Sequence, residues 1–122
     1  MTQTGTRGRV TAILRLEGLV VAALALWAYT QTGAGWLLFG LLVLAPDLFM
    51  LGYLRGPRMG AVLYNIGHTY VVPVSLTVAG VLVGIDLAPA LGLIWVFHIG
   101  ADRALGYGLK YDSGFKDTHL GR

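Results

Sequence analysis

Six side chains that could do chemistry interrupt stretches of the sequence that are otherwise almost wholly apolar. They are Glu17, Asp47, Asn65, His68, His98 and Asp102. A charged side chain costs about 3 kcal/mol at the centre of a membrane helix, so one that is kept there marks a candidate functional site. Imidazoles and carboxylates together serve general acid–base catalysis, and the same groups coordinate zinc, iron or manganese. These residue types therefore predict a polar site inside an apolar protein.

The spacing of these residues along the chain places several of them on shared helix faces. His98 and Asp102 are four residues apart, so they lie on one face of a helix. His68 has Asn65 three residues before it and Tyr64 four residues before it, which gives a second such face. We predict that the two faces meet in one pocket.

We assign the candidate residues to three roles. The predicted catalytic residues are Asp47, His68, His98, Asp102 and Glu17, and the predicted ligand-binding residues are Asn65, Tyr64, Arg103 and Lys110. A divalent metal is the cofactor that these residue types allow, with His68, His98 and Asp102 as its ligands. The sequence has no HExxH motif and no paired ExxH motif, so the spacing selects no particular metal. Asp117 and His119, in the C-terminal tail, are weaker candidates.

Packing is the alternative explanation for the same residues. Membrane bundles use Asn, His and carboxylate side chains to join helices. In addition, Arg15 or Arg103 would form ion pairs with Glu17, Asp47 or Asp102. Helix joints do not require five ionisable groups at one depth, and we therefore favour a functional site.

The composition identifies the environment of this site. Of the 122 residues, 56% are hydrophobic and 12% are charged, whereas a soluble domain carries about 25% charged residues. A chain this short has too little interior to hide so much apolar surface from water, so we expect the lipid bilayer to surround it. The absence of cysteine excludes disulfides and thiolate chemistry. The net charge of +3 does not indicate a nucleic-acid partner, because the basic residues are confined to loops and tails.

Four stretches are long enough to cross the hydrocarbon, which takes about 20 helical residues. They cover residues 11–30, 35–53, 60–84 and 87–107, and a tail follows at residues 108–122. The connections are short, so consecutive helices are expected to be antiparallel neighbours. The sequence therefore predicts one all-α domain over residues 1–122, a bundle of four transmembrane helices. A signal peptide is the alternative for the first stretch, but Arg15 and Glu17 would interrupt its apolar core.

All the Lys and Arg residues fall on one side of a bundle with four spans. They are Arg7, Arg9, Arg15, Arg55, Arg58, Arg103, Lys110, Lys116 and Arg122. Basic short loops stay in the cytoplasm, which predicts a multi-pass protein of the inner (cytoplasmic) membrane with both termini inside. The candidate site residues then lie in the cytoplasmic half of the bilayer.

Prolines and glycines modify this picture of regular helices. Pro46 is expected to loosen the second span, and Pro73 is expected to bend the third one turn beyond His68. Gly80 and Gly84 form a GxxxG motif, which serves either close packing within the bundle or the seam of a homodimer. We favour internal packing, with the homodimer as the second interpretation.

Several segments resemble an uncharacterised bacterial family of small four-helix integral membrane proteins. The likeness is carried by residues 45–48, by the Tyr-Asn-Ile-Gly-His-Thr-Tyr stretch at residues 64–70, by residues 98–111 and by residues 114–121. It extends over nearly the whole chain from Leu14. The family is catalogued as a domain of unknown function. The resemblance implies the membrane fold and supports the choice of motifs, and it implies no activity.

The sequence predicts a small membrane enzyme or binding protein with a pocket that faces the cytoplasm. Its His, Asp and Glu side chains would act by acid–base or metal-assisted chemistry on a lipophilic or small ligand. A proton-coupled transporter or channel is the first alternative, although the outer half offers few polar residues for a path. A structural or assembly subunit of a membrane complex is the second alternative.

Overall fold

The computed structural model describes residues 3–110 and 118–120, and this part of the chain is all-α. The elements are α1 (Gln3–Thr30), α2 (Trp36–Leu42), the 3-10 helix η1 (Ala45–Arg55), α3 (Pro57–His68), α4 (Val71–Val83) and α5 (Leu87–Leu105). Between the described residues after α5 there is one isolated β-bridge, which joins Lys110 and Thr118. The predicted all-α class is confirmed.

Three segments of the described chain are long and apolar enough to cross a membrane. They are Gly8–Thr30, Trp36–Arg55 and Pro57–Val83. The fourth expected span, residues 87–107, is helical as α5 but is not among the three. Helix α5 carries the histidine, aspartate and arginine of the candidate site, and these side chains lower its hydropathy. It buries residues along most of its length, from Ala90 to Gly100.

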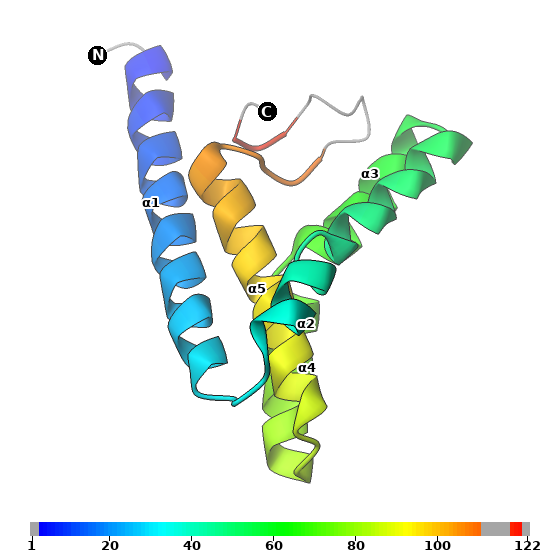
Figure 1. The fold of residues 1–122 in the computed structure, drawn as a ribbon. Coiled ribbons are helices and arrows are strands. Elements are labelled where there is room, and N and C mark those ends of the chain that lie inside the picture. The colour runs from blue at the N-terminus through cyan, green and yellow to red at the C-terminus, as the bar shows by residue number, and fades with distance from the viewer. Residues whose placement is uncertain (1–2, 111–117, 121–122) are drawn as a thin grey trace.

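Helix α5 is the element against which α1 and α4 pack (Figure 1). It lies alongside α1 and alongside α4, while η1 pairs with α3 in a hairpin that points away from α1. The prediction that consecutive helices are neighbours is therefore correct for η1 and α3 and for α4 and α5. In the first pair, α1 packs along its length against α5 and meets α2 at its C-terminal end, where the Tyr29 ring contacts Trp36 and Phe39.

The second and third expected helices are each broken in two. The segment 35–53 divides into α2, which ends at Leu42, and η1, in which Pro46 is the second residue. The segment 60–84 divides at Thr69, whose backbone is extended, with φ −98° and ψ 147°. Proline has no amide hydrogen, so Pro73 cannot bond to the Thr69 carbonyl as an α-helix requires. The bend expected beyond His68 is thus a break immediately after it.

Close helix contacts explain the positions of several glycines. A Cβ atom built on Gly18 of α1 would lie 2.8 Å from the Gly100 carbonyl oxygen of α5, and one on Gly100 would lie 2.7 Å from the Gly18 carbonyl oxygen. One glycine of the GxxxG motif, Gly80, makes a close contact inside the chain as well. Gly80 faces Ala88 at the start of α5, and Gly84 ends α4 with a φ of +82°. The contacts of Gly18, Gly80 and Gly100 agree with the interpretation that glycines serve packing within the chain.

Candidate metal centre

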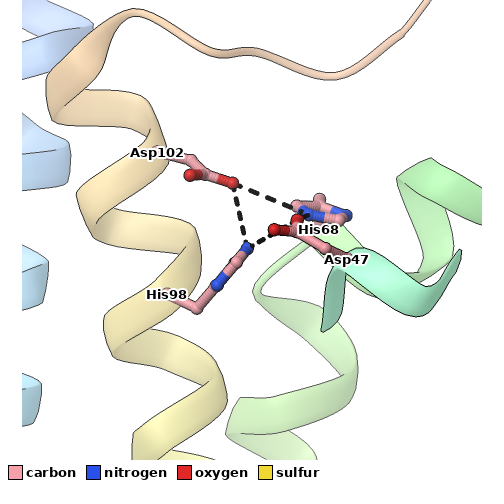
Figure 2. A group of neighbouring side chains, drawn as sticks. All are labelled: Asp47, His68, His98 and Asp102. Carbon is pink, nitrogen blue, oxygen red and sulfur yellow. Dashed lines mark hydrogen bonds and ion pairs between the residues drawn. The ribbon is translucent and has the colours of Figure 1, made fainter. Parts of the chain in front are cut away.

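Four of the five predicted catalytic side chains meet at one point (Figure 2). One ligand atom from each of Asp47, His68, His98 and Asp102 lies within 4.8 Å of the other three. Asp47 comes from η1, His68 is the last residue of α3, and His98 and Asp102 project from successive turns of α5. Both histidines are buried, whereas the aspartates are half-buried.

The contacts among these side chains all involve the Nε2 atoms of the histidines. His98 Nε2 lies 3.1 Å from Asp47 Oδ1 and 3.1 Å from Asp102 Oδ2. His68 Nε2 lies 3.1 Å from Asp47 Oδ1 and 3.6 Å from Asp102 Oδ2. Each Nε2 atom therefore faces one oxygen of Asp47 and one oxygen of Asp102.

Backbone carbonyls fix the orientation of both imidazole rings. His68 Nδ1 lies 2.8 Å from the Tyr64 carbonyl oxygen, and His98 Nδ1 lies 2.6 Å from the Val43 carbonyl oxygen. A carbonyl oxygen only accepts hydrogen bonds, so both Nδ1 atoms carry the hydrogen and donate it. In the neutral ring each Nε2 then presents a lone pair.

The break before η1 makes the Val43 carbonyl accessible to His98. In an α-helix the amide of Asp47 would bond to the carbonyl four residues earlier, which is that of Val43. Here the Asp47 amide bonds instead to Leu44, three residues earlier, at 3.0 Å. The change to a 3-10 helix thus has two effects on the centre. It frees the carbonyl that orients the His98 ring, and it positions the side chain of Asp47.

Lone pairs on the two Nε2 atoms facing two carboxylates repel one another unless a positive charge lies between them. A metal ion would supply that charge, and the four nitrogen–oxygen distances are close to those of a tetrahedral site, while all six distances among the ligand atoms lie within 4.8 Å. Tetrahedral zinc with bonds of about 2.0–2.1 Å has ligand atoms about 3.3 Å apart. The four nitrogen–oxygen separations are 3.1, 3.1, 3.1 and 3.6 Å.

Aromatic and cationic side chains pack around the four residues of the centre and bond to the backbone beside them. The Tyr64 ring stacks on the His68 ring with 3.7 Å between centroids. Arg103 donates to the His68 carbonyl oxygen at 3.1 Å, and Trp95 Nε1 donates to the Gly67 carbonyl oxygen at 2.6 Å. Side chains of α5 thereby satisfy the last carbonyls of α3, which have no partner within their own helix.

The chain after α5 is fastened to α3 by the side chain of Asn65. Its Nδ2 donates to the Lys110 carbonyl oxygen at 2.7 Å, and its Oδ1 accepts from the Lys110 amide at 2.6 Å. The ammonium of Lys110 lies 4.7 Å from the centroid of the Tyr64 ring. Burial lowers the pKa of Lys110 and the charge of Asp102 opposes that shift. All four predicted ligand-binding residues thus lie around the centre.

A small polar cavity of about 190 Å³ opens beside the centre. It is lined by Asp47, Met50, Tyr64, Asp102, Tyr107 and Lys110. Two of the candidate metal ligands therefore form part of a wall that a small molecule can reach. Met50, Tyr107 and Trp95 were missed by the sequence interpretation, although Trp95 lies one turn before His98 on the same helix face.

Glu17 does not belong to this group of four, and its catalytic role stays a prediction. Its side chain is exposed on α1 and is not in the group of four. The face of α1 that meets α5 includes Arg15 and Gly18, and Gly18 lies about 100° further round the helix than Glu17. Asp117 lies outside the described residues. His119 accepts a hydrogen bond from the Leu109 amide at 2.9 Å.

Fold and site together define a class of protein. The chain is all-α, three of its segments have the length and apolarity of membrane spans, and it holds a buried group of two histidines and two aspartates. Residues 11–122 match the model of a family described as a domain of unknown function, DUF4260, and the chain belongs to that family. The expected resemblance to an uncharacterised family is confirmed. No curated protein and no solved structure matches the chain.

Proposed function

We propose that this chain is a metal-dependent membrane protein that holds one divalent transition metal between Asp47, His68, His98 and Asp102. One observation carries the proposal: both Nδ1 atoms donate to backbone carbonyls, so both Nε2 lone pairs point at the carboxylates. The centre borders a cavity, which favours an enzyme acting on a small or lipophilic ligand.

A metal accounts for the contacts of His98 better than a proton does. His98 Nε2 lies 3.1 Å from an oxygen of each aspartate. A proton on Nε2 points along one direction and makes one good hydrogen bond. A metal between the four atoms is shared by all of them at once. Two imidazoles with two carboxylates suit zinc first, and iron or manganese next.

The bound metal would act as a Lewis acid on a water molecule or a ligand oxygen in the adjoining cavity. The hydrogen bonds of the two histidines support such a role, because histidines that bind metals normally donate the hydrogen of their other ring nitrogen to a carbonyl or carboxylate. Both histidines of this centre do so, to the carbonyls of Tyr64 and Val43.

The arrangement of the helices supports four spans with both termini on the cytoplasmic side of the inner membrane. Helix α5 lies antiparallel to α1 along its length, so a bilayer that α1 crosses is crossed by α5 as well (Figure 1). The start of α1, the η1–α3 connection and the end of α5 lie toward one end of the molecule, and the Lys and Arg residues of the described chain are in or next to these segments. Positive charge in short loops favours the cytoplasmic side.

Metal analysis of the purified protein tests the proposal. Protein prepared in mild detergent without chelator is expected to contain about one transition metal ion per chain. His98→Asn and Asp102→Asn are expected to lower metal affinity by about 10-fold or more, because each removes one ligand. His119→Gln is the matched control, since it removes the histidine outside the group of four.

The contrary results are equally clear. Wild-type protein that contains no stoichiometric metal, and takes up none after incubation with zinc, iron or manganese, contradicts the proposal. Equal loss of metal in His119→Gln and His98→Asn places the metal elsewhere. A metal-free centre would favour the transporter alternative, in which the same four side chains relay protons.

A further inference from the structure

The four candidate metal ligands are divided between two parts of the fold. Asp47 and His68 belong to the hairpin that η1 forms with α3, whereas His98 and Asp102 belong to α5 (Figure 2). Helix α5 packs along α1 and α4, and we call these three helices the core. A metal ion that all four side chains bind therefore joins the hairpin to the core.

The hairpin is connected to the rest of the chain by a break in helical structure on each side. Residues 43–44 separate α2 from η1, and residues 69–70 separate α3 from α4. Between these two joints, α3 packs along η1, and among the described helices neither of the two packs along α1 or α4 (Figure 1). Backbone torsions at a few residues between elements are enough to let a packed unit rotate. The hairpin therefore has a possible hinge at both of its connections.

Side-chain hydrogen bonds from α5 hold the hairpin at its base. The carbonyls of Gly67 and His68 accept from Trp95 and Arg103, directly beside the joint at residues 69–70. The far end of the hairpin is the start of α3, which is 12 residues long, or about 18 Å. Bonds at the joint restrain that far end weakly, because a small rotation at the base moves it over a large distance.

Two further contacts restrain the hairpin beyond the joint. Asn65 bonds to the backbone of Lys110, in the segment after α5, and Phe49 stacks on Trp95 with 6.2 Å between ring centroids. The first of them reaches the core only through a segment that is not helical. The second is a contact between two apolar rings, which has no strong directional preference.

The metal centre differs from these contacts because it holds both helices of the hairpin at once. Asp47 fixes η1 and His68 fixes α3, and the angles between the ligands are set by the geometry of the ion. Without an ion, the two carboxylates repel each other across the same gap. An ion that needs all four ligands binds only the arrangement in which they converge, so its binding shifts the population toward that arrangement.

The polar cavity beside the centre has walls on both parts of the fold. Half of its lining residues come from the hairpin and half from α5 and the chain after it: Asp47, Met50 and Tyr64 on one side, and Asp102, Tyr107 and Lys110 on the other. A rotation of the hairpin at its joints therefore separates one wall of the cavity from the other.

We infer that the bound metal cross-links the hairpin to α5 and thereby assembles the polar cavity. Without the ion, the hairpin rotates about residues 43–44 and 69–70, and the two walls move apart. The inference rests on the metal centre proposed above and states how its occupancy regulates the site. The metal binds first, and a small ligand then binds to the cavity that the metal has assembled.

Distances between pairs of nitroxide spin labels test this inference, because the chain has no cysteine of its own. Met59→Cys labels the far end of the hairpin and Ile13→Cys labels α1, and both positions are exposed. Double electron–electron resonance is recorded in phosphatidylcholine nanodiscs with zinc, which is diamagnetic, and after its removal by a chelator. Ile13→Cys with Leu82→Cys, near the end of α4, is the control pair within the core. The zinc content of every sample is measured.

We expect a narrow distribution of Met59–Ile13 distances with zinc, and the same distribution again when zinc is restored. Removal of zinc should broaden this distribution or shift it by about 5 Å, which a rotation of about 15° produces at the end of α3. The control pair should not change. A protein with both His98→Asn and Asp102→Asn lacks the ligands on α5, so its Met59–Ile13 distribution should be broad with and without zinc.

Three results overturn this inference alone: stoichiometric zinc that leaves the Met59–Ile13 distances unchanged, an equal change in the control pair, and a wild-type response in the protein without His98 and Asp102. A wild-type protein that binds no zinc, iron or manganese overturns the metal centre and this inference together.

Discussion

At the scale of single residues, the centre depends on backbone carbonyls that irregular helix ends leave for side chains to bind. His98 donates a hydrogen bond to the carbonyl of Val43, Trp95 donates one to that of Gly67, and Arg103 donates one to that of His68. Each of these bonds fixes one side chain and satisfies one carbonyl, and an unsatisfied carbonyl inside a membrane costs several kcal/mol. The same contacts therefore hold the fold and aim the candidate ligands.

His119 gives a pH-dependent prediction at this scale. Burial and the nearby charge of Arg103 lower its pKa below 6.5, and the contact with the backbone at Leu109 only partly offsets this. Because the folded state favours neutral His119, its contribution to the packing of residues 118–120 is complete above pH 6.5. That contribution is lost as the pH falls. We expect the Leu109 amide, which donates to His119, to be less protected from exchange with solvent at pH 5.5 than at pH 7.5.

Hydrogen exchange, corrected for the intrinsic effect of pH on amide rates, measures this change. His119→Gln cannot take up a proton in this range, so it should show no excess exchange at Leu109 at the lower pH. An equal excess in His119→Gln and in the wild type would contradict the role of His119.

The sequence predicted the meeting of Asp47, His68, His98 and Asp102 because their residue types are costly in an apolar helix and two of them share a face. It did not exclude Glu17, because exposure depends on how α1 is rotated against α5. The bond from His98 to the Val43 carbonyl could not be predicted either. That bond depends on the change from α-helix to 3-10 helix between Leu42 and Ala45. The sequence does not show where this change occurs, because contacts with distant parts of the chain help to determine it.

At the scale of the elements, the pair α1 and α5 positions the centre, because α5 carries two of its ligands. The buried residues of α1 lie along one face of the helix and are Gly18, Ala22, Ala25 and Tyr29. Small side chains let two membrane helices approach closely and gain van der Waals contact. Where Gly18, Ala22 and Ala25 face α5, the distance between the two helices is therefore set by residues with a small side chain or none.

Gly18→Ala tests this contact. The added Cβ would lie 2.8 Å from the Gly100 carbonyl oxygen, which is backbone and cannot move aside alone. We expect a loss of about 1–3 kcal/mol in the free energy of unfolding and a lower metal affinity, because α5 shifts. Reversible unfolding in mixed micelles measures the first, and a competition assay with a zinc chelator measures the second.

Gly40→Ala is the matched control, because nothing lies within 4 Å of a Cβ at that position in α2. It should be neutral or slightly stabilising, since alanine favours a helix more than glycine does. A Gly18→Ala protein as stable as Gly40→Ala would contradict the close approach of α1 and α5.

The positions of the helices were largely predictable from apolar stretches of sufficient length, but the breaks within them were not. Pro46 and Pro73 indicated where regular bonding fails. The place at which the chain leaves the helix, at Thr69, also depends on Trp95 and Arg103 binding the carbonyls just before it. Those partners are distant in sequence, so local patterns do not show them.

At the scale of the whole molecule, the distribution of charge predicts which ends face the cytoplasm. The chain has no cysteine, so each introduced cysteine reports on its own position. In intact cells, a membrane-impermeant maleimide is expected to label Gln31→Cys and Asp86→Cys. It should label Met59→Cys, next to the η1–α3 connection, only after the membrane is made permeable.

The result that contradicts this topology is labelling of Met59→Cys in intact cells while Gln31→Cys stays protected. Labelling of Gln31→Cys but not Asp86→Cys would contradict the crossing by Pro57–Val83, because Asp86 would then lie on the same side of the bilayer as Met59. The expression level of each variant, measured by a C-terminal tag, is the control for unequal amounts of protein.

The pairing of α1 with α5 has a consequence for how the protein is made. The ribosome produces α1 before α5, so α1 enters the bilayer without the partner that it finally packs against. A chain that stops before Leu87 has an unmatched small-residue face on α1 and lacks both His98 and Asp102. Only a finished chain can close the bundle, and in the proposed metal centre only a finished chain can take up its ion. Metal loading would then mark completed copies of the protein and distinguish them from fragments that proteases should remove.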